Sequence, residues 1–409
     1  MKAMQNIIIL GMGMSARDLT AAHLEIIRGA DLLMGGRRHL APFKDLAVPK
    51  QVITGDIDAV MATLRAQPAE RRVVVLASGD PLLFGIGARI VRDIDPQRVC
   101  VVPNVSSIAA AFARIREAWH TAALVSLHGR QDTQPLAIAL RTHAHVAVLT
   151  DARHTPAWLA GWLRDKGAGQ ARMAVFEQMG TAAEKIAWYT PAQALDLNFS
   201  TPNLVIVKTD PQARADARRL QIGMRDAAFA HDQGMITKAE VRAVVLAKLR
   251  LQPGMTLWDL GAGSGAVGIE ASVLLGAGRI VAVEQHPERV ARIRANARRY
   301  HVYNHEAIQA RLPEGMAALP APARIFIGGG GRDLTAIVQA AADRLPPGGV
   351  IVVNTVLLDN LTSTIHALEA RGLSAEVVQL QVARTRPMPW SSRLLAENPV
   401  WVISGIRKE

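Results

Sequence analysis

The feature that most constrains the fold is a glycine-rich turn in the stretch WDLGAGSGAVGIE, which begins at Trp258. Gly261, Gly263 and Gly265 follow an apolar run and open a predicted helix. Glycine allows positive φ angles and close approach of a ligand, and the N-terminus of a helix offers free N–H groups. Glu284 ends the next apolar run, where its carboxylate can accept hydrogen bonds from both hydroxyls of a ribose. The pattern predicts a nucleotide-like ligand at the edge of a doubly wound α/β sheet.

The turn leaves more than one ligand open. Gly261, Gly263 and Ala266 also fit a dinucleotide fingerprint, so NAD is an alternative, and a turn that serves only the fold is another. Asp259 lies two residues before the first glycine, where it would crowd a pyrophosphate but suits an ammonium group. S-adenosylmethionine has an ammonium, a ribose and no phosphate, and is therefore favoured. The predicted contacts are Asp259, Gly261, Ala262, Gly263, Ser264, Gly265 and Glu284.

Two further stretches of the second half are predicted to reach the same site. Thr237 and Glu240 form a T-x-x-E capping box, so we expect Thr237 to cap a helix and also to contact the cofactor. The stretch FIGGGGRD removes every side chain from the end of a strand, where ligands bind in open α/β sheets. The expected substrate contacts there are Gly328, Gly329 and Gly330.

The 409 residues are too many for one typical domain. Short apolar strands alternate with helical stretches throughout, which predicts parallel-rich α/β folds. We expect a first domain over residues 1–210, with two α/β lobes that divide near residue 115. The polar stretch 211–230 is predicted to be a linker. Residues 231–409 are predicted to form a complete doubly wound Rossmann-like sheet.

Composition narrows the class of partner. Cys100 is the only cysteine, which excludes an internal disulfide and a multi-thiolate metal site, and we expect no bound metal. No apolar run reaches the roughly 18 residues of a membrane span, so we expect a cytoplasmic protein without a membrane partner. The net charge of +12 suits either a solvated surface or an acidic small-molecule substrate. Six arginines on predicted loops could line such a site: Arg37, Arg38, Arg130, Arg332, Arg384 and Arg386.

Five loops of the first half are informative when they are considered together and in order. They are GMGMSARDLT (11–20), GGRRHL (35–40), SGDPLLFGIG (78–87), PNVSS (103–107) and SLHGR (126–130). In this order they resemble the tetrapyrrole methylases of corrin synthesis, in the branch that acts on precorrin-6. The second half, with WDLGAGSGAVGIEAS and NPVWVISG, resembles the class I methyltransferase partner of the same step. The whole chain resembles the decarboxylating C5,15-methyltransferases of precorrin-6Y.

This resemblance implies two unrelated S-adenosylmethionine sites in one chain. The first half would bind its cofactor through a GDP loop and a Ser-Ser loop, which here are Gly79, Asp80, Pro81, Leu82, Leu83, Ser106 and Ser107. Gly11 and Gly13 would lie beside the tetrapyrrole, although this loop lacks the proline and third glycine that are usual there. In the second half, Thr237, the Gly261–Gly265 turn and Glu284 match the family's cofactor residues. Adenine would be held by backbone near Leu312.

The implied reaction methylates carbons 5 and 15 of precorrin-6B and removes carbon dioxide from the acetate side chain at carbon 12. The product would be precorrin-8, in cobalamin synthesis. His231, on the loop before Thr237, is a candidate proton donor. A methyltransferase acting on nucleic acid is the rival function, but it predicts a target-base motif such as N-P-P-Y, where this chain has FIGGGG. We expect a tetrapyrrole polycarboxylate as substrate, no nucleic-acid partner and a homo-oligomer.

Overall fold

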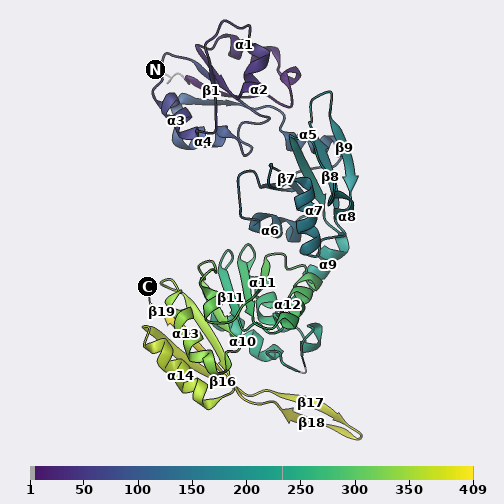
Figure 1. Cartoon of the computed structure of the whole chain (residues 1–409), viewed down its shortest axis with the longest axis vertical. Helices are drawn as coiled ribbons and strands as arrows, with labels where there is room; N and C mark the ends of the chain where they lie inside the picture. The colour runs from purple at the N-terminus through teal and green to yellow at the C-terminus, as the bar shows by residue number, and fades with distance from the viewer. Residues whose placement is uncertain (1–4, 233, 409) are drawn as a thin grey trace. The chain divides into compact units, whose positions relative to one another are not determined.

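The computed structural model describes residues 5–232 and 234–408, and Figure 1 traces the chain. The chain divides into two compact units. The first comprises 1–130, 145–159 and 172–208, and the second comprises 131–144, 160–171 and 209–409. The mixed α/β class predicted from the sequence is confirmed. No helix in the described part of the chain is long and apolar enough to cross a bilayer.

The first unit contains two sheets. One is wholly parallel, in the order β3-β2-β4-β1-β5, and apolar clusters cover both of its faces. Burial on both faces explains its nearly continuous apolar strands. Its strands are β1 (Ile7–Gly11), β2 (Leu32–Gly35), β3 (Lys50–Val52), β4 (Val73–Ala77) and β5 (Val99–Val102). Its helices are α1 (Ala21–Arg28), α2 (Arg37–Leu40), α3 (Ile57–Arg65) and α4 (Ile86–Asp93).

The second sheet of this unit is mixed, in the order β6-β7-β10-β8-β9. The β6–β7 pair is parallel and the other pairs are antiparallel. Its strands are β6 (Ala123–Ser126), β7 (His145–Leu149), β8 (Arg172–Glu177), β9 (Lys185–Tyr189) and β10 (Asn203–Lys208). Helix α5 (Ser107–Ile115) joins the two sheets along the chain and shares an apolar cluster with the second. Helix α8 (Pro191–Ala194) also belongs to this unit, whereas α6 (Gln134–Thr142) and most of α7 (Pro156–Asp165) fall within the residues of the second.

The second unit contains a seven-stranded sheet in the order β13-β12-β11-β14-β15-β19-β16. The strands from β13 to β15 are parallel, whereas β19 runs antiparallel to both of its neighbours. This is the doubly wound sheet that the sequence predicted. The strands are β11 (Thr256–Leu260), β12 (Arg279–Glu284), β13 (His305–Gln309), β14 (Arg324–Ile327), β15 (Val350–Thr355), β16 (Leu373–Leu380) and β19 (Val400–Arg407).

Helices cover both faces of this sheet. One apolar cluster joins it to α10 (Ala239–Leu249), α11 (Ala266–Leu275) and the end of α12 (Pro287–Arg299). A second cluster joins the opposite face to α13 (Leu334–Asp343) and α14 (Leu358–Glu369). The interior strand β11 supplies both clusters, with Leu257 on one side and Trp258 on the other. The carboxyl ends of the parallel strands are thereby fixed, together with the loops that follow them.

Two features of the second unit differ from what the sequence predicted. The stretch 211–230 contains a helix, α9 (Pro211–Arg219), and its Leu220 and Phe229 are buried in the core of the unit. A hairpin of β17 (Ala383–Met388) and β18 (Ser391–Ala396) projects from the sheet (Figure 1), and every residue of β18 is exposed. No sequence pattern indicated this hairpin, because its strands lack the alternation of a half-buried strand.

Candidate functional site

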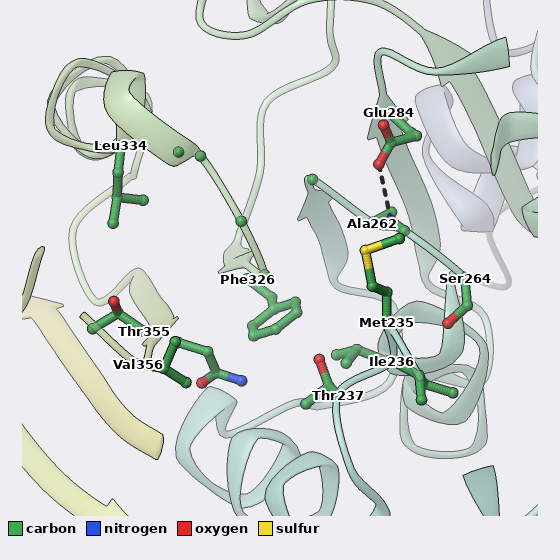
Figure 2. Close-up of a pocket in the computed structure, with 18 of the residues that line it drawn as sticks. Met235, Ile236, Thr237, Ala262, Ser264, Glu284, Phe326, Leu334, Thr355 and Val356 are labelled. Carbon is green, nitrogen blue, oxygen red and sulfur yellow. Dashed lines mark hydrogen bonds between the residues drawn. The ribbon is translucent and has the colours of Figure 1, made fainter. Parts of the chain in front are cut away.

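A cavity of about 1330 Å³ opens at the carboxyl ends of the parallel strands in the second unit. Loops after β11, β12, β14 and β15 line it, together with the segment before α10. Figure 2 shows Glu284 and Ser264 on one side, with Leu334, Thr355 and Val356 on the other. Such a position, outside the carboxyl ends of the strands, is where open α/β sheets bind their ligands.

The glycine turn forms one wall of this cavity. Gly261, Gly263 and Gly265 have φ angles of +67°, +57° and +73°, which residues with a side chain rarely adopt. A Cβ on Gly261 would lie 2.8 Å from the carbonyl oxygen of Gly329, so the turn and the loop after β14 pack backbone against backbone. A Cβ on Gly263 would meet no described atom within 4 Å, because this residue faces the open cavity. Ala262 and Ser264 also line it.

Glu284 lines the cavity at the end of β12, where the sequence placed it. Its Oε2 accepts a hydrogen bond from the N–H of Gly263 at 3.1 Å, and its Oε1 accepts one from the N–H of His286 at 3.1 Å. Both oxygens are thus oriented by backbone, and each keeps a lone pair for a further donor. The side chain can therefore accept hydrogen bonds from two adjacent hydroxyl groups.

Asp259 is buried beneath the turn and is not among the described residues that line the cavity. Its Oδ2 accepts a hydrogen bond from the N–H of Gly268 in α11 at 3.0 Å, while its Oδ1 has no partner among the described residues. The pKa of Asp259 is raised to about 7, because burial and the nearby charge of Glu284 outweigh the lowering effect of the Gly268 hydrogen bond. The carboxyl fastens the first turn of α11 to β11, and its contact with a cofactor stays a prediction.

The predicted capping box at Thr237 is wrong. Helix α10 begins at Ala239, its N-cap is Lys238, and no side chain in the described part of the chain caps it. Glu240 instead pairs with Arg384 of the β17–β18 hairpin. The Thr237 side chain is thereby left free of the helix, and Thr237 lines the cavity beside Met235 and Ile236 (Figure 2).

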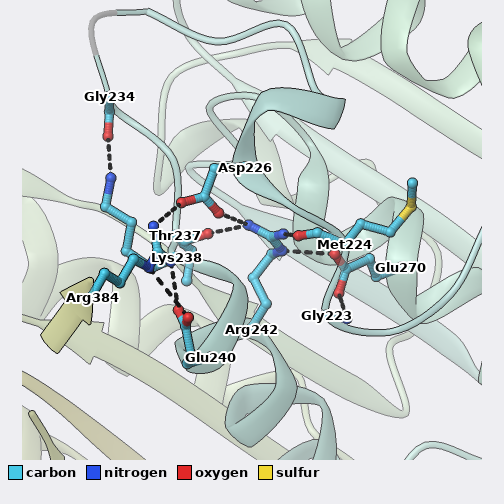
Figure 3. Close-up of polar contacts among 10 residues, drawn as sticks. All are labelled: Gly223, Met224, Asp226, Gly234, Thr237, Lys238, Glu240, Arg242, Glu270 and Arg384. Atoms are coloured by element: carbon cyan, nitrogen blue, oxygen red, sulfur yellow. Dashed lines mark hydrogen bonds and ion pairs between the residues drawn. The ribbon is translucent and has the colours of Figure 1, made fainter. Parts of the chain in front are cut away.

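A buried arginine holds this segment in place. Arg242 is fully buried and its Nε donates to Glu270 at 2.8 Å, while one terminal nitrogen donates to Asp226 at 2.9 Å. The same guanidinium donates to the carbonyl oxygens of Thr237 and Met224. Figure 3 shows it at the centre of this network. The guanidinium therefore fixes the backbone of the cavity-lining segment, a role that nothing in the sequence indicated.

The loop after β14 forms the adjacent part of the wall. Gly328, Gly329 and Gly330 all line the cavity, and a Cβ on Gly329 would have no described atom within 4 Å. Phe326 and Leu334 add apolar side chains beside them (Figure 2). The wall thus offers an apolar surface and exposed backbone, which suits a flat, largely apolar ligand. The sequence indicated the glycines, whereas Phe326 and Leu334 resembled ordinary core residues and were missed.

Some of the remaining predicted site residues line the cavity and others do not. Leu312 lines it, as do Arg289, Arg311 and Arg332. His231 does not belong to the described lining, and its buried Nδ1 has no partner among residues 5–232 and 234–408. Arg384 is absent from that lining because it pairs with Asp226 and Glu240. Arg311 pairs with Asp333, which also lines the cavity, and Arg289 pairs with Asp232, whereas Arg332 forms no ion pair among the described residues.

The loops of the first unit gather at the carboxyl ends of β1, β4 and β5. Gly13 and Gly79 form a backbone bridge, with Gly79 at φ +54°. A Cβ on Gly11 would lie 2.5 Å from the Gly79 carbonyl oxygen and 2.9 Å from Asn104, so no side chain fits there. The Asn104 amide donates to the carbonyl oxygen of Gly11 at 3.0 Å. Loops distant in sequence are thus tied into one cluster.

The cofactor residues predicted in this unit belong to the same cluster. Asp80 Oδ1 accepts from the N–H of Leu82 at 2.8 Å, which closes the turn at Pro81. Ser106 caps α5, as predicted, by accepting from the N–H of Ala109 at 3.0 Å. Leu82 is half exposed, Leu83 packs against the apolar cluster of the second sheet, and Ser107 begins the helix.

The carboxylate of Asp18 holds the first glycine loop. Asp18 Oδ2 accepts hydrogen bonds from the N–H groups of Met14 at 2.7 Å and Ser15 at 3.1 Å. The same carboxylate lies 2.8 Å from the Cβ position of Gly13, whose φ is +64°. Asp18 thus holds the turn that follows Gly13. Its place in the RD pair of GMGMSARDLT was the available signal.

The comparisons with known proteins cover both halves. A family model described as precorrin methyltransferase domain matches residues 227–405, and one for the tetrapyrrole (corrin/porphyrin) methylases matches 6–196. A precorrin-6Y C(5,15)-methyltransferase (decarboxylating) of Sinorhizobium sp is 36% identical over 391 residues, which are 93% of this chain and 89% of the relative.

Two shorter relatives each correspond to about half of the chain. A probable cobalt-precorrin-6B C(15)-methyltransferase (decarboxylating) of Pyrobaculum calidifontis is 39% identical and covers 45% of this chain and 95% of its own. A cobalt-precorrin-7 C(5)-methyltransferase of Salmonella typhimurium is 35% identical and covers 49% of this chain and 97% of its own.

Proposed function

The chain belongs to the family of decarboxylating precorrin-6Y C5,15-methyltransferases, and from this premise we propose how its two halves divide the reaction. The enzyme uses S-adenosylmethionine to methylate carbons 5 and 15 of precorrin-6B, and it removes carbon dioxide from the acetate side chain at carbon 12. The product is precorrin-8, in cobalamin synthesis. We assign carbon 5 to residues 1–210, and carbon 15 with the decarboxylation to residues 231–409.

Two observations support this division. The shorter relatives carry the C(15) decarboxylating and the C(5) activities in separate chains, each about half as long as this one. The glycine loops of each half also form a separate cluster on a separate sheet. Two independent sites for S-adenosylmethionine follow from the proposal, one in each half.

At the second site, the proposed cofactor contacts that line the cavity are Thr237, Gly261, Ala262, Gly263, Ser264, Glu284 and Leu312. Asp259 and Gly265 are outside the described lining, and we propose that they act on the cofactor by shaping the turn. S-adenosylmethionine supplies a methyl group that is already activated by its sulfonium. Glu284 would accept hydrogen bonds from the ribose hydroxyls, with both oxygens oriented by backbone N–H groups. Gly263 leaves room for the methionine portion, because no described atom lies within 4 Å of its Cβ position. Two features therefore support the fit of this ligand to the cavity: the open space beside Gly263 and the oriented carboxylate of Glu284.

The macrocycle would lie on the Gly328–Gly330 wall beside Phe326. Arg332, which lines the cavity and forms no ion pair among the described residues, would attract and orient its carboxylates. Much of the catalysis would come from alignment, since the meso carbons are enamine-like nucleophiles. The conjugated ring can accept the electrons that decarboxylation leaves. We assign His231 no part in this step, because it is not among the described residues that line the cavity.

At the first site, the proposed cofactor contacts are Gly79, Asp80, Pro81, Leu82, Leu83, Ser106 and Ser107. Gly11 and Gly13 would contact the tetrapyrrole. These assignments are supported by the position of the loops, which cluster at the carboxyl ends of three parallel strands. Glycines lie where the backbones of two loops come closest to each other. Such a cluster exposes backbone groups to a ligand from several loops at once.

Replacing Glu284 with glutamine tests the count and the placement of the cofactor sites. The amide can accept at only one of its two terminal atoms, so the ribose loses a charged acceptor worth about 1.5–3 kcal/mol, or roughly 10- to 150-fold in Kd. Titration calorimetry of the wild type should show two sites per chain, of which the variant weakens one. Glu288, exposed on α12, provides the control, and Glu288→Gln should leave both affinities unchanged. A single site, or two sites weakened together, would contradict the assignment.

We also propose that the chain forms a homo-oligomer. The β17–β18 hairpin exposes apolar side chains, with Trp390 80% and Leu394 70% accessible. A two-stranded hairpin is marginally stable by itself in water, so a second copy that covers these side chains would stabilise it. Light scattering of the purified chain measures the assembly directly.

A further inference from the structure

An interacting serine and histidine lie in the first unit, outside every contact assigned so far. Ser78 Oγ lies 2.9 Å from Nε2 of His39, and Arg38 donates to the same Oγ at 3.4 Å. An arginine can only donate, so the Ser78 oxygen accepts from Arg38 and its hydroxyl hydrogen is free to bond His39. When the imidazole carries its proton on Nδ1, Nε2 accepts this hydrogen bond from the Ser78 hydroxyl. The two residues come from GGRRHL and SGDPLLFGIG, two loops that the sequence singled out.

The state of His39 suits a proton acceptor. Burial lowers the pKa of His39, and the charge of Arg38 lowers it further. The imidazole is therefore neutral at neutral pH. A neutral imidazole within hydrogen-bond reach of a hydroxyl can take the proton of that hydroxyl when the hydroxyl receives another.

Ser78 lies close to the proposed site of methyl transfer in the first unit. Ser78 follows the last residue of β4, and α2, which carries His39, follows the neighbouring strand β2. Ser78 is exposed, and the next residue is Gly79, which pairs with Gly13. In the proposed function Gly79 contacts the methyl donor and Gly13 the macrocycle. The hydroxyl thus lies beside the place where donor and acceptor would meet.

The reaction at a meso carbon releases a proton that some group must accept. The ring carbon forms its bond to the methyl group with its own π electrons, and the sulfur keeps the pair from the broken S–CH3 bond. The carbon then carries both hydrogen and methyl, and the conjugated system carries a positive charge. Breaking the C–H bond returns its electron pair to the ring and removes that charge. One proton leaves for each methyl added.

We propose that Ser78 and His39 accept the proton that carbon 5 loses, with Ser78 as the group that meets it. The proton passes to the Ser78 oxygen while the serine hydrogen moves to Nε2 of His39. Arg38 stabilises the serine oxygen during the exchange, and the imidazolium then releases its proton to water. The inference rests on the assignment of carbon 5 to the first half.

The test uses the full chain with His39→Ala, precorrin-6B and S-adenosylmethionine. General-base catalysis contributes about 100- to 10,000-fold, so we expect carbon 5 methylation to slow by about 100-fold or more. Carbon 15 methylation and decarboxylation should continue at the wild-type rate. Added imidazole should restore part of the lost rate, and a substrate deuterated at carbon 5 should show a larger isotope effect than with the wild type. His120→Ala removes an exposed histidine of the same unit and should change nothing.

A measurement without substrate checks the pair itself. The ¹⁵N signal of His39 should report an unprotonated Nε2 that accepts a hydrogen bond, and Ser78→Ala should shift that signal. Unchanged carbon 5 methylation in His39→Ala, or a slowed reaction without imidazole rescue or a larger isotope effect, would overturn the proposal. Loss of carbon 15 methylation with carbon 5 methylation intact would instead overturn the division between the halves.

Discussion

Replacing Gly263 with valine is expected to abolish methylation at carbon 15 while the chain stays folded. The Cβ position of Gly263 faces the open cavity, so the valine side chain would occupy the space proposed for the methionine portion of the cofactor. The change has the largest effect we expect on the reaction, because it removes a binding site rather than a single hydrogen bond. Mass spectrometry of the products from precorrin-6B would show no methyl at carbon 15.

The control for this variant is Gly254→Val. Gly254 has a φ of +85°, so valine imposes a similar backbone strain there, and its Cβ position also has no described atom within 4 Å. Gly254 is not among the described residues that line the cavity. Both variants should lose a similar, small amount of stability, of order 1–3 kcal/mol, but only Gly263→Val should lose carbon 15 methylation. Equal activity in the two variants would place the cofactor elsewhere.

Arg242→Met is expected to have the largest effect on stability. Methionine removes the guanidinium and leaves Glu270, whose side chain is fully buried, without its ion-pair partner. Breaking a buried pair in this way costs about 3–5 kcal/mol. At about 2–4 °C per kcal/mol for a unit of this size, the unfolding transition of the second half should fall by roughly 6–20 °C. Differential scanning calorimetry measures the temperature of this transition.

A neighbouring arginine of the same network provides the comparison. Arg384 pairs with Asp226 and Glu240 but is 37% exposed, and Asp226 keeps Arg242 when Arg384 is replaced (Figure 3). Partly exposed pairs contribute about 0–1 kcal/mol, so Arg384→Met should lower the transition by only a few degrees. An Arg242→Met transition no lower than that of Arg384→Met would show that the buried guanidinium does not hold the unit together.

The sequence was sufficient for most of the sheet in the second half. Strands buried on both faces are nearly continuous apolar runs. The sequence pattern predicts a strand over 279–284 and a helix over 287–299, and β12 and α12 have these bounds. Strand β13, HEAIQ, was missed because it lies at the edge of the sheet and carries polar residues. The short strand β3 was missed for the same reason.

The sequence predicted the parts of the cavity wall that are built from glycine loops. It did not predict the parts whose position is set by contacts between distant residues. The turn at Gly261–Gly265 and the loop at Gly328–Gly330 are both visible in the sequence, and both contribute to the cavity wall. Thr237 was assigned to a helix cap from a local pattern. Its position is instead set by Arg242 and by the pairing of Glu240 with the β17–β18 hairpin. Arg242 is held in turn by Glu270, and Glu240 by Arg384, and both of these partners lie far from the segment in sequence, so no local pattern reveals the arrangement.

In the proposed function, each half of the chain performs its own methylation. Closing the first site alone tests this division, with Gly11→Val in the full chain, since a side chain there would collide with Gly79 and Asn104. The quantity to measure is the mass of the product formed from precorrin-6B with an excess of S-adenosylmethionine. We expect a product with one methyl gained, at carbon 15, and one carbon dioxide lost. A product with both methyl groups, or a folded variant that neither methylates nor decarboxylates, would contradict the division.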